Sequence, residues 1–262
     1  MTGAAVALTA LCSAPPASAA LTYVESSNTV TNGGNTGTAL ATCGGGSFVV
    51  GGGAFSTGGF GQVSIDASYP WNPNSWREYT DVSTGPQSNR AYAICDDTEP
   101  VVRNGSDQAP AGAKRTVRAH CRGNTNAYGG GHYSAVLARS SRPFDDGDAG
   151  GVRDDGWEAS FYNNNNGSDS LDVYALCGPK NTTVKAKTRS LGSARQGLVA
   201  AACPAGDRVT GGGAGIVGGG WISSLYPDDG DDADDEPDNR WKAFLENTSA
   251  KKRDITAYVV CR

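Results

Sequence analysis

Short runs in which apolar and polar residues alternate recur along the whole chain. Residues 172–175 (DVYA) and 256–259 (TAYV) show the two-residue period of a strand with one buried face. Clusters of Gly, Pro, Asn and Asp separate such runs, as turns separate strands. Outside an apolar segment near the N-terminus, we find no ten-residue stretch with the 3.6-residue period of a helix. The pattern predicts an all-β protein.

One series of sequence features occurs three times. Cys43, Cys121 and Cys203 are each followed eight residues later by three consecutive glycines. A Ser/Pro element and a tryptophan strand come next, and the series closes on a cysteine 19, 20 and 20 residues after the tryptophan; these pairs are Trp76 and Cys95, Trp157 and Cys177, and Trp241 and Cys261. A fixed period of this kind marks an internal repeat. We expect one domain over residues 20–262, with repeats at about 20–98, 99–180 and 181–262.

The six cysteines of the repeats predict three disulfides. Six cysteines allow fifteen pairings, and the repetition selects one bridge within each repeat: Cys43–Cys95, Cys121–Cys177 and Cys203–Cys261. Closing a loop of about 50 residues stabilises a fold by on the order of 4 kcal/mol. No C-x-x-C motif or histidine partner accompanies these cysteines, so a structural role is expected.

The glycine triplets and the tryptophans suggest how the repeats pack. Missing Cβ atoms let strands approach closely or bulge, so we expect the triplets to gather around a shared axis and the repeated tryptophans to anchor the core. Short connections at 96–100 and 178–180 favour one closed body with pseudo-threefold symmetry. Trp71 and Trp221 break the repeat and are candidate binding residues.

In plan, this organisation resembles the β-prism of the vitelline-membrane outer-layer proteins, which have three disulfide-bearing Greek-key repeats. The resemblance spans residues 20–262 and implies three pseudo-symmetric antiparallel sheets, one from each repeat. The triple glycines and longer units depart from that family. A β-trefoil and three small sandwiches in a row are the alternatives. The C-x₈-Gly-Gly-Gly to Tyr-Ala-x-Cys unit also resembles modules of secreted actinobacterial proteins, which implies a part in a secreted toxin assembly or in cell-surface recognition.

The N-terminal segment predicts export. Residues 4–11 are apolar and residues 17–19 (ASA) fit a cleavage site, so residues 1–19 are expected to be a signal peptide. No later apolar stretch is long enough to cross a bilayer. An even number of cysteines then suits an oxidising compartment, and we expect a secreted, extracellular protein without a membrane span.

The charge is unevenly distributed. The formal net charge is −5, but residues 228–238 hold eight acidic side chains, which leaves 19 acidic against 22 basic residues elsewhere. No clustered basic stretch of the kind that binds nucleic acid is present. We therefore expect a protein or glycan partner and no nucleic acid.

Two acidic segments follow the prolines of the second and third repeats, where the first repeat has the uncharged residues 71–74. Their candidate binding residues are Asp145, Asp146 and Asp148, and Asp228, Asp229, Asp231 and Asp232. Clustered carboxylates suit Ca²⁺, although the spacing is not that of an EF-hand. A solvated, self-repelling loop and a docking patch for a basic partner are the other interpretations.

The sequence offers little for catalysis. The two histidines, His120 and His132, have no G-x-S-x-G element to work with, while carboxylate pairs for glycoside hydrolysis stay open. We expect a non-catalytic binding or adaptor protein that recognises another protein, as a subunit of a secreted, toxin-like complex in one form of this hypothesis. A carbohydrate-binding lectin is the alternative, followed by a secreted hydrolase or an inhibitor of one.

Overall fold

A computed structural model describes residues 21–147, 152–230 and 236–262. These residues form 18 strands, six per repeat, and contain no helix. The first repeat holds β1 (Thr22–Val30), β2 (Asn35–Thr42), β3 (Phe48–Ser56), β4 (Val63–Asn72), β5 (Ser75–Val82) and β6 (Gln87–Asp96). The second holds β7 (Val101–Ala109), β8 (Lys114–His120), β9 (Thr125–Ser134), β10 (Leu137–Phe144), β11 (Gly156–Tyr162) and β12 (Asp169–Pro179). The third holds β13 (Thr183–Leu191), β14 (Arg195–Ala202), β15 (Val209–Ile216), β16 (Trp221–Asp228), β17 (Arg240–Asn247) and β18 (Arg253–Cys261). The all-β prediction is confirmed.

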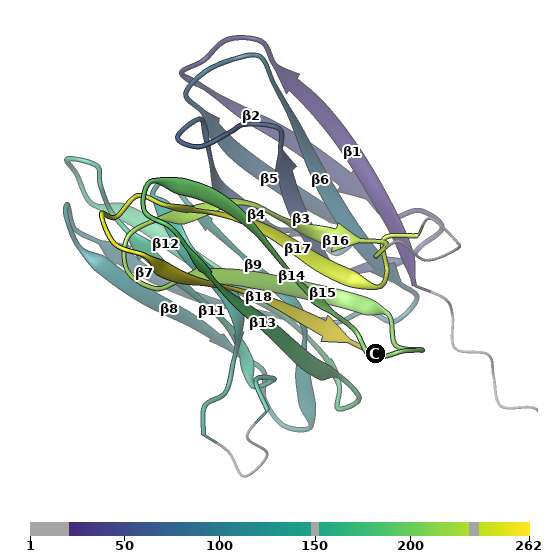
Figure 1. The fold of residues 1–262 in the computed structure, drawn as a ribbon. Helices are drawn as coiled ribbons and strands as arrows, with labels where there is room; N and C mark the ends of the chain where they lie inside the picture. Colours follow the sequence, from purple (N-terminus) through teal and green to yellow (C-terminus); the bar gives the residue numbers. More distant parts are fainter. Residues whose placement is uncertain (1–20, 148–151, 231–235) are drawn as a thin grey trace, which may run out of the picture.

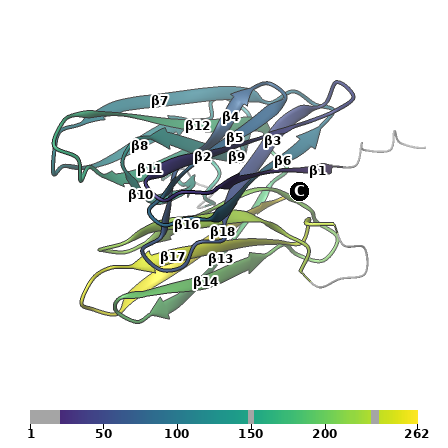
Figure 2. The same ribbon diagram turned by 90° about the horizontal axis from the view of Figure 1, so that it is seen from above.

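The strands form three six-stranded antiparallel sheets, and every sheet is shared by two repeats. Sheet A has the order β1-β6-β3-β16-β17-β14, sheet B the order β2-β5-β4-β9-β12-β7, and sheet C the order β13-β18-β15-β10-β11-β8. Each repeat therefore contributes three strands to one sheet and three to the next. Figure 1 shows the three repeats as separate regions of colour, and Figure 2 shows from above how their strands meet near the centre.

This arrangement corrects the expectation that each repeat supplies a sheet of its own. Each repeat is a two-layer sandwich, but its two layers continue into different neighbours through the pairs β3–β16, β4–β9 and β10–β15. The repeats are thus joined by backbone pairing, which a row of three independent sandwiches would lack. Sharing sheets in a cycle produces the pseudo-threefold body that the short connections favoured.

All three predicted disulfides are confirmed. Cys43–Cys95, Cys121–Cys177 and Cys203–Cys261 close loops with sequence separations of 52, 56 and 58 residues. In each case the first cysteine follows a strand of one sheet and the second lies in a strand of another sheet, for example after β2 and in β6. Each disulfide therefore fastens together the two layers of one repeat.

The glycine triplets lie where β3, β9 and β15 meet, as the sequence predicted. A Cβ on Gly51 would overlap the carbonyl of Thr210, and a Cβ on Gly129 or Gly211 would be too close to the backbone of the next repeat in the same cyclic way. The third glycine of each triplet touches the strand that pairs with it from the neighbouring repeat; Gly53, for example, lies against the carbonyl of Leu225. Only glycine permits these backbone approaches.

The middle glycine of each triplet receives the repeat's tryptophan. A Cβ on Gly52 would overlap the indole of Trp76, and the same holds for Gly130 with Trp157 and Gly212 with Trp241. All three tryptophans have 0% relative exposure. They are core anchors, as predicted, and each fills the space that its glycine leaves.

Residues 1–20, which include the predicted signal peptide, lie outside the described residues. In the described part of the chain no helix is long and apolar enough to cross a membrane.

Candidate functional site

The outer face of sheet B carries a continuous cluster of aromatic side chains. Alternate residues of a strand point to opposite faces of a sheet, and in β4, β5, β9 and β12 five of the residues that alternate with the core positions are aromatic. We call this set the aromatic face; it comprises Tyr69, Trp71, Arg77, Tyr79, Tyr133 and Tyr174. Four of the six residues come from the first repeat and two from the second.

Tyr69 lies at the centre of the aromatic face. Its ring centroid is 5.5 Å from that of Tyr174, 5.3 Å from that of Tyr133 and 6.4 Å from that of Tyr79. Tyr79 and Tyr133 also contact each other edge to face, with centroids 6.1 Å apart. Such ring pairs stabilise one another beyond their burial, so the cluster presents an ordered surface.

The rim of the aromatic face is exposed and carries a stacked cation. The Arg77 guanidinium carbon lies 3.5 Å from the ring centroid of Trp71, a cation–π contact. Trp71 is 49% exposed and Tyr133 is 41% exposed, whereas Tyr69 beneath them is 6% exposed. Large aromatic side chains left in water next to a buried one form an exposed apolar patch, and such patches mark interaction sites.

Burial keeps two tyrosines of this face, Tyr69 and Tyr174, in the neutral, protonated form. Burial is the main cause that raises the pKa of Tyr69 to about 12, and the neighbouring Tyr79 adds to it. Burial also raises the pKa of Tyr174, with the nearby Asp172 as the next cause. The hydroxyls of Tyr69 and Tyr174 are therefore protonated at every physiological pH and can donate as well as accept hydrogen bonds.

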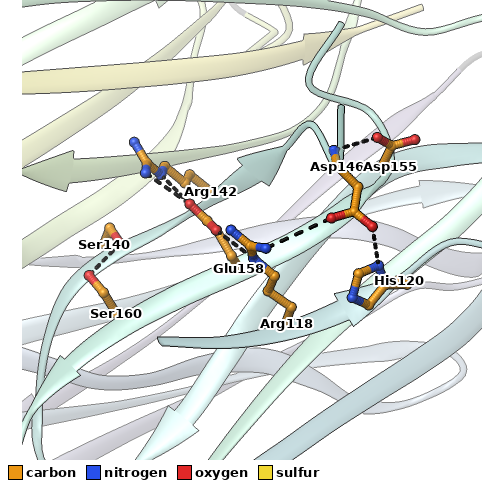
Figure 3. A network of polar contacts seen from close by, with 8 residues as sticks. All are labelled: Arg118, His120, Ser140, Arg142, Asp146, Asp155, Glu158 and Ser160. Atoms are coloured by element: carbon orange, nitrogen blue, oxygen red, sulfur yellow. Dashed lines mark hydrogen bonds and ion pairs between the residues drawn. The ribbon is translucent and has the colours of Figure 1, made fainter. Parts of the chain in front are cut away.

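The equivalent positions of sheet C carry two charged, two small and only two aromatic residues. Strand registers align the aromatic face with Arg142, Phe144, Glu158, Ser160, Gly215 and Tyr258. Figure 3 shows the ion-pair network that results on this face.

Glu158 is the centre of the network. Its two carboxylate oxygens accept hydrogen bonds from Nε of Arg118 and Nε of Arg142, both at 3.0 Å. Asp146 adds contacts of 3.8 Å to Arg118 and 3.6 Å to His120. The charged side chains on this face pair with one another, so fewer groups are free to contact an external partner than on the aromatic face.

Sheet A has an intermediate face. Tyr92 and Tyr226 stack at 5.6 Å and Phe55 contacts Tyr226 at 5.1 Å. A second part of the face is charged, because Lys242 pairs with Asp228 at 2.6 Å. Aromatic character thus falls from sheet B through sheet A to sheet C.

The predicted acidic binding residues do not come together in the described chain. Asp145 and Asp228 accept hydrogen bonds from the backbone N–H groups of Gly147 and Gly230, and Asp228 also pairs with Lys242. Asp229 is described and has a partner of its own, while Asp148, Asp231 and Asp232 lie outside the described residues.

Among the described residues no group of three or more His, Cys, Asp or Glu side chains is arranged to hold a metal ion. The Ca²⁺ interpretation of the acidic segments therefore stays a prediction.

The two tryptophans outside the repeat pattern differ in their surroundings. Trp71 belongs to the aromatic face. Trp221 is half-buried, its Nε1 donates to the carbonyl oxygen of Val63 at 3.1 Å, and it lines a separate pocket. The two tryptophans that the sequence singled out as candidate binding residues therefore lie on two different surfaces.

The histidines occupy unlike environments. His132 is fully buried in β9, its pKa is lowered to about 4 by burial, and Nε2 lies 3.5 Å from the carbonyl oxygen of Ile65. His120 stacks edge to face on Phe144 and contacts Asp146. Neither histidine hydrogen-bonds a serine hydroxyl in the described structure, as a nucleophile–base pair requires.

The tyrosines of the aromatic face were missed in the sequence. The signal was present, because Tyr69 and Trp71, like Arg77 and Tyr79, occupy alternate positions and so share one face of a strand. Their gathering with Tyr133 and Tyr174 depends on the pairing of β4 with β9, which joins two repeats.

No protein-family model matches the chain, and no curated protein matches it.

Proposed function

We propose that this chain is a secreted, non-catalytic binding or adaptor protein that recognises another protein through the aromatic face of sheet B. The observation that carries the proposal is the exposed cluster around Tyr69, with Trp71 stacked on Arg77. Trp, Tyr and Arg are the residues enriched in the centres of protein interfaces, and they dominate binding energies there.

The scaffold supports the same proposal. Three disulfides and backbone pairing between repeats hold the face on strands rather than on loops. A preorganised surface loses little conformational entropy on binding. Membership of a larger secreted, toxin-like complex is one form of this function.

The test compares the outer faces of sheets B and C in one binding experiment. Wild-type protein is immobilised and exposed to the supernatant of the secreting cells, beside a Trp71→Ala/Tyr133→Ser variant and a control with Arg118→Ala and Glu158→Ala on sheet C. We expect one defined protein to bind wild type and control alike, with the aromatic-face variant at least about 30-fold weaker, which corresponds to about 2 kcal/mol. The dissociation constants are then measured by surface plasmon resonance with the purified partner.

Two outcomes count against the proposal. Retention that is the same for all three proteins would assign the binding to another surface. Loss of the aromatic-face signal only on a glycan array, with no protein retained, would make the face a lectin surface, which is the alternative function.

A further inference from the structure

A pocket of about 220 Å³ lies where all three repeats converge. Its walls include Ser64 at the start of β4, Leu137 at the start of β10 and Trp221 at the start of β16. These residues hold equivalent positions in the three repeats. Each directly precedes a core residue that is followed by a β-bulge, and these core residues are Ile65, Ala138 and Ile222. The pocket therefore lies on the pseudo-threefold axis.

The three repeats contribute chemically different side chains to the walls of the pocket. Trp221 provides an aromatic ring whose orientation is held by the hydrogen bond from Nε1 to the carbonyl of Val63. Asp81 and Asn164 line the pocket from the first and second repeats, and both are exposed. Neither side chain makes a hydrogen bond within the described chain, so a carboxylate and an amide are available to a ligand.

Two further carboxyl groups lie behind the walls. Ser64 donates from Oγ to Asp66 at 3.0 Å. The N–H of Gly61, a wall residue, donates to Oε2 of Glu246 at 2.8 Å, while Oε1 of the fully buried Glu246 has no partner in the described structure. Burial raises the pKa of Asp66 and of Glu246 to about 7 each. Near neutral pH these groups can therefore donate as well as accept hydrogen bonds.

We propose that this axial pocket binds one saccharide residue. A sugar ring offers an apolar C–H face and a rim of hydroxyls, and the pocket offers an indole beside a mixed set of donors and acceptors. No Lys, Arg or His is among the described residues that line it, so an anionic ligand would find no counter-charge. The volume is below the range of drug-sized sites and suits a single ring.

The test measures sugar binding directly. Glucose, galactose, mannose and N-acetylglucosamine, and oligosaccharides that end in each, are titrated against the full chain by saturation-transfer-difference NMR. We expect at least one sugar to bind saturably and Asp81→Asn and Trp221→Ala each to weaken it by about tenfold or more, the loss of roughly one hydrogen bond to a charged group or one ring contact. Equal affinity for the free sugar and the chain end would make the pocket a monosaccharide site, and tighter binding of the oligosaccharide would make it a chain-end site.

Trp71→Ala serves as the matched control, because it removes an exposed tryptophan from the aromatic face and leaves the pocket intact. Sugar binding that is lost in Trp71→Ala and kept in Asp81→Asn would overturn the axial site, as would the absence of saturable binding by every sugar tested. If circular dichroism shows that Trp221→Ala disturbs the fold, the sugar affinity of Asp81→Asn, a change at the exposed rim, tests the proposal by itself. Protein recognition by the aromatic face can fail or hold without affecting this result.

Discussion

The interior of the first repeat is more polar than the interiors of the other two repeats at equivalent positions. Glu78, Thr80, Asn89 and Ser56 lie inside the first repeat, and all are buried. The second repeat has Ala159, Phe161, Leu171 and Ser134 at these positions, and the third has Ala243, Leu245, Ile255 and Ile216.

Several polar atoms of the first repeat's interior have no partner within the described structure. Thr80 donates to Oε2 of Glu78 at 2.5 Å, but Oε1 of Glu78, both side-chain polar atoms of Asn89 and Oγ of Ser56 are left unpaired. Buried unpaired polar groups each cost about 1–3 kcal/mol. The fold therefore tolerates a polar interior in the first repeat, because the same disulfide, buried tryptophan and glycine triplet stabilise the backbone of each of the three repeats.

The same repeat carries most of both candidate surfaces. It supplies four of the six residues of the aromatic face and the Ser64 and Asp81 side of the axial pocket. Departures from local rules concentrate at functional sites in natural proteins. The first repeat is therefore where the scaffold departs most from a purely structural unit.

Removal of the first disulfide is expected to give a large effect that distinguishes the polar interior of the first repeat from the apolar interior of the third. Cys43→Ala/Cys95→Ala is expected to lower the free energy of unfolding by about 4 kcal/mol and to remove hydrogen-exchange protection first in β5 and β6. Cys203→Ala/Cys261→Ala is the control, because its loop is similar in length and the third repeat keeps an apolar interior. Equal loss of protection in the two variants would remove the distinction between the interiors.

Glu78 sharpens the comparison through pH. Burial raises the pKa of Glu78 to about 8, against an ordinary value of 4.5, and outweighs its hydrogen bonds. A carboxyl whose pKa rises on folding stabilises the fold fully only below about pH 4.5, and this contribution is lost as the pH rises through 8. Glu78→Gln removes the titration, so we expect it to match wild type near pH 4 and to exceed its stability by on the order of 5 kcal/mol near pH 9.

Denaturant unfolding across that pH range provides the measurement. Glu25→Gln is the control, since Glu25 is exposed and pairs with Arg90 at 3.0 Å on the surface. A constant difference between Glu78→Gln and wild type at every pH would show that Glu78 does not titrate in the folded interior.

The tryptophan anchors offer a smaller test. Nε1 of Trp76 donates to Ser68 and Nε1 of Trp157 donates to Ser141, both at 2.9 Å. In the third repeat Leu225 stands at this position, and Nε1 of Trp241 has no partner in the described structure.

Ser68→Ala and Ser141→Ala would leave the first two anchors like the third. Each is expected to lower the free energy of unfolding by about 1–3 kcal/mol, because a buried N–H loses its acceptor. Chemical denaturation measures the loss, with the exposed Ser27→Ala as a control that changes stability by less than about 0.5 kcal/mol. If both anchor variants behaved like the control, the hydrogen bonds would be of no consequence to stability.

The smallest expected effect on stability is at the aromatic face itself. Tyr79→Ser installs the sheet C residue Ser160 at the same position. We expect a stability change below about 1 kcal/mol, since Tyr79 is only partly buried on the outer face. A thermal-unfolding loss as large as that of Ser68→Ala would assign this tyrosine a structural role.

The all-β class, the three repeats and the disulfide pairing could all be predicted from the chain alone. Each depends on local period or on repetition, such as the fixed distance from Trp76 to Cys95 and from Trp157 to Cys177. Trp71 and Trp221 could be singled out for a similar reason, because a residue that breaks a repeat is visible without coordinates.

Tertiary structure alone decided which strands of different repeats pair, and through that pairing both candidate sites. Tyr69 meets Tyr133 and Tyr174 because β4 pairs with β9 across a repeat boundary, and Ser64, Leu137 and Trp221 converge because the repeats surround one axis. Sequence periods report which face of a strand is buried, and the glycine triplets report where backbones approach closely, but the triplets are alike in all three repeats and do not specify which strand of another repeat pairs beside each one.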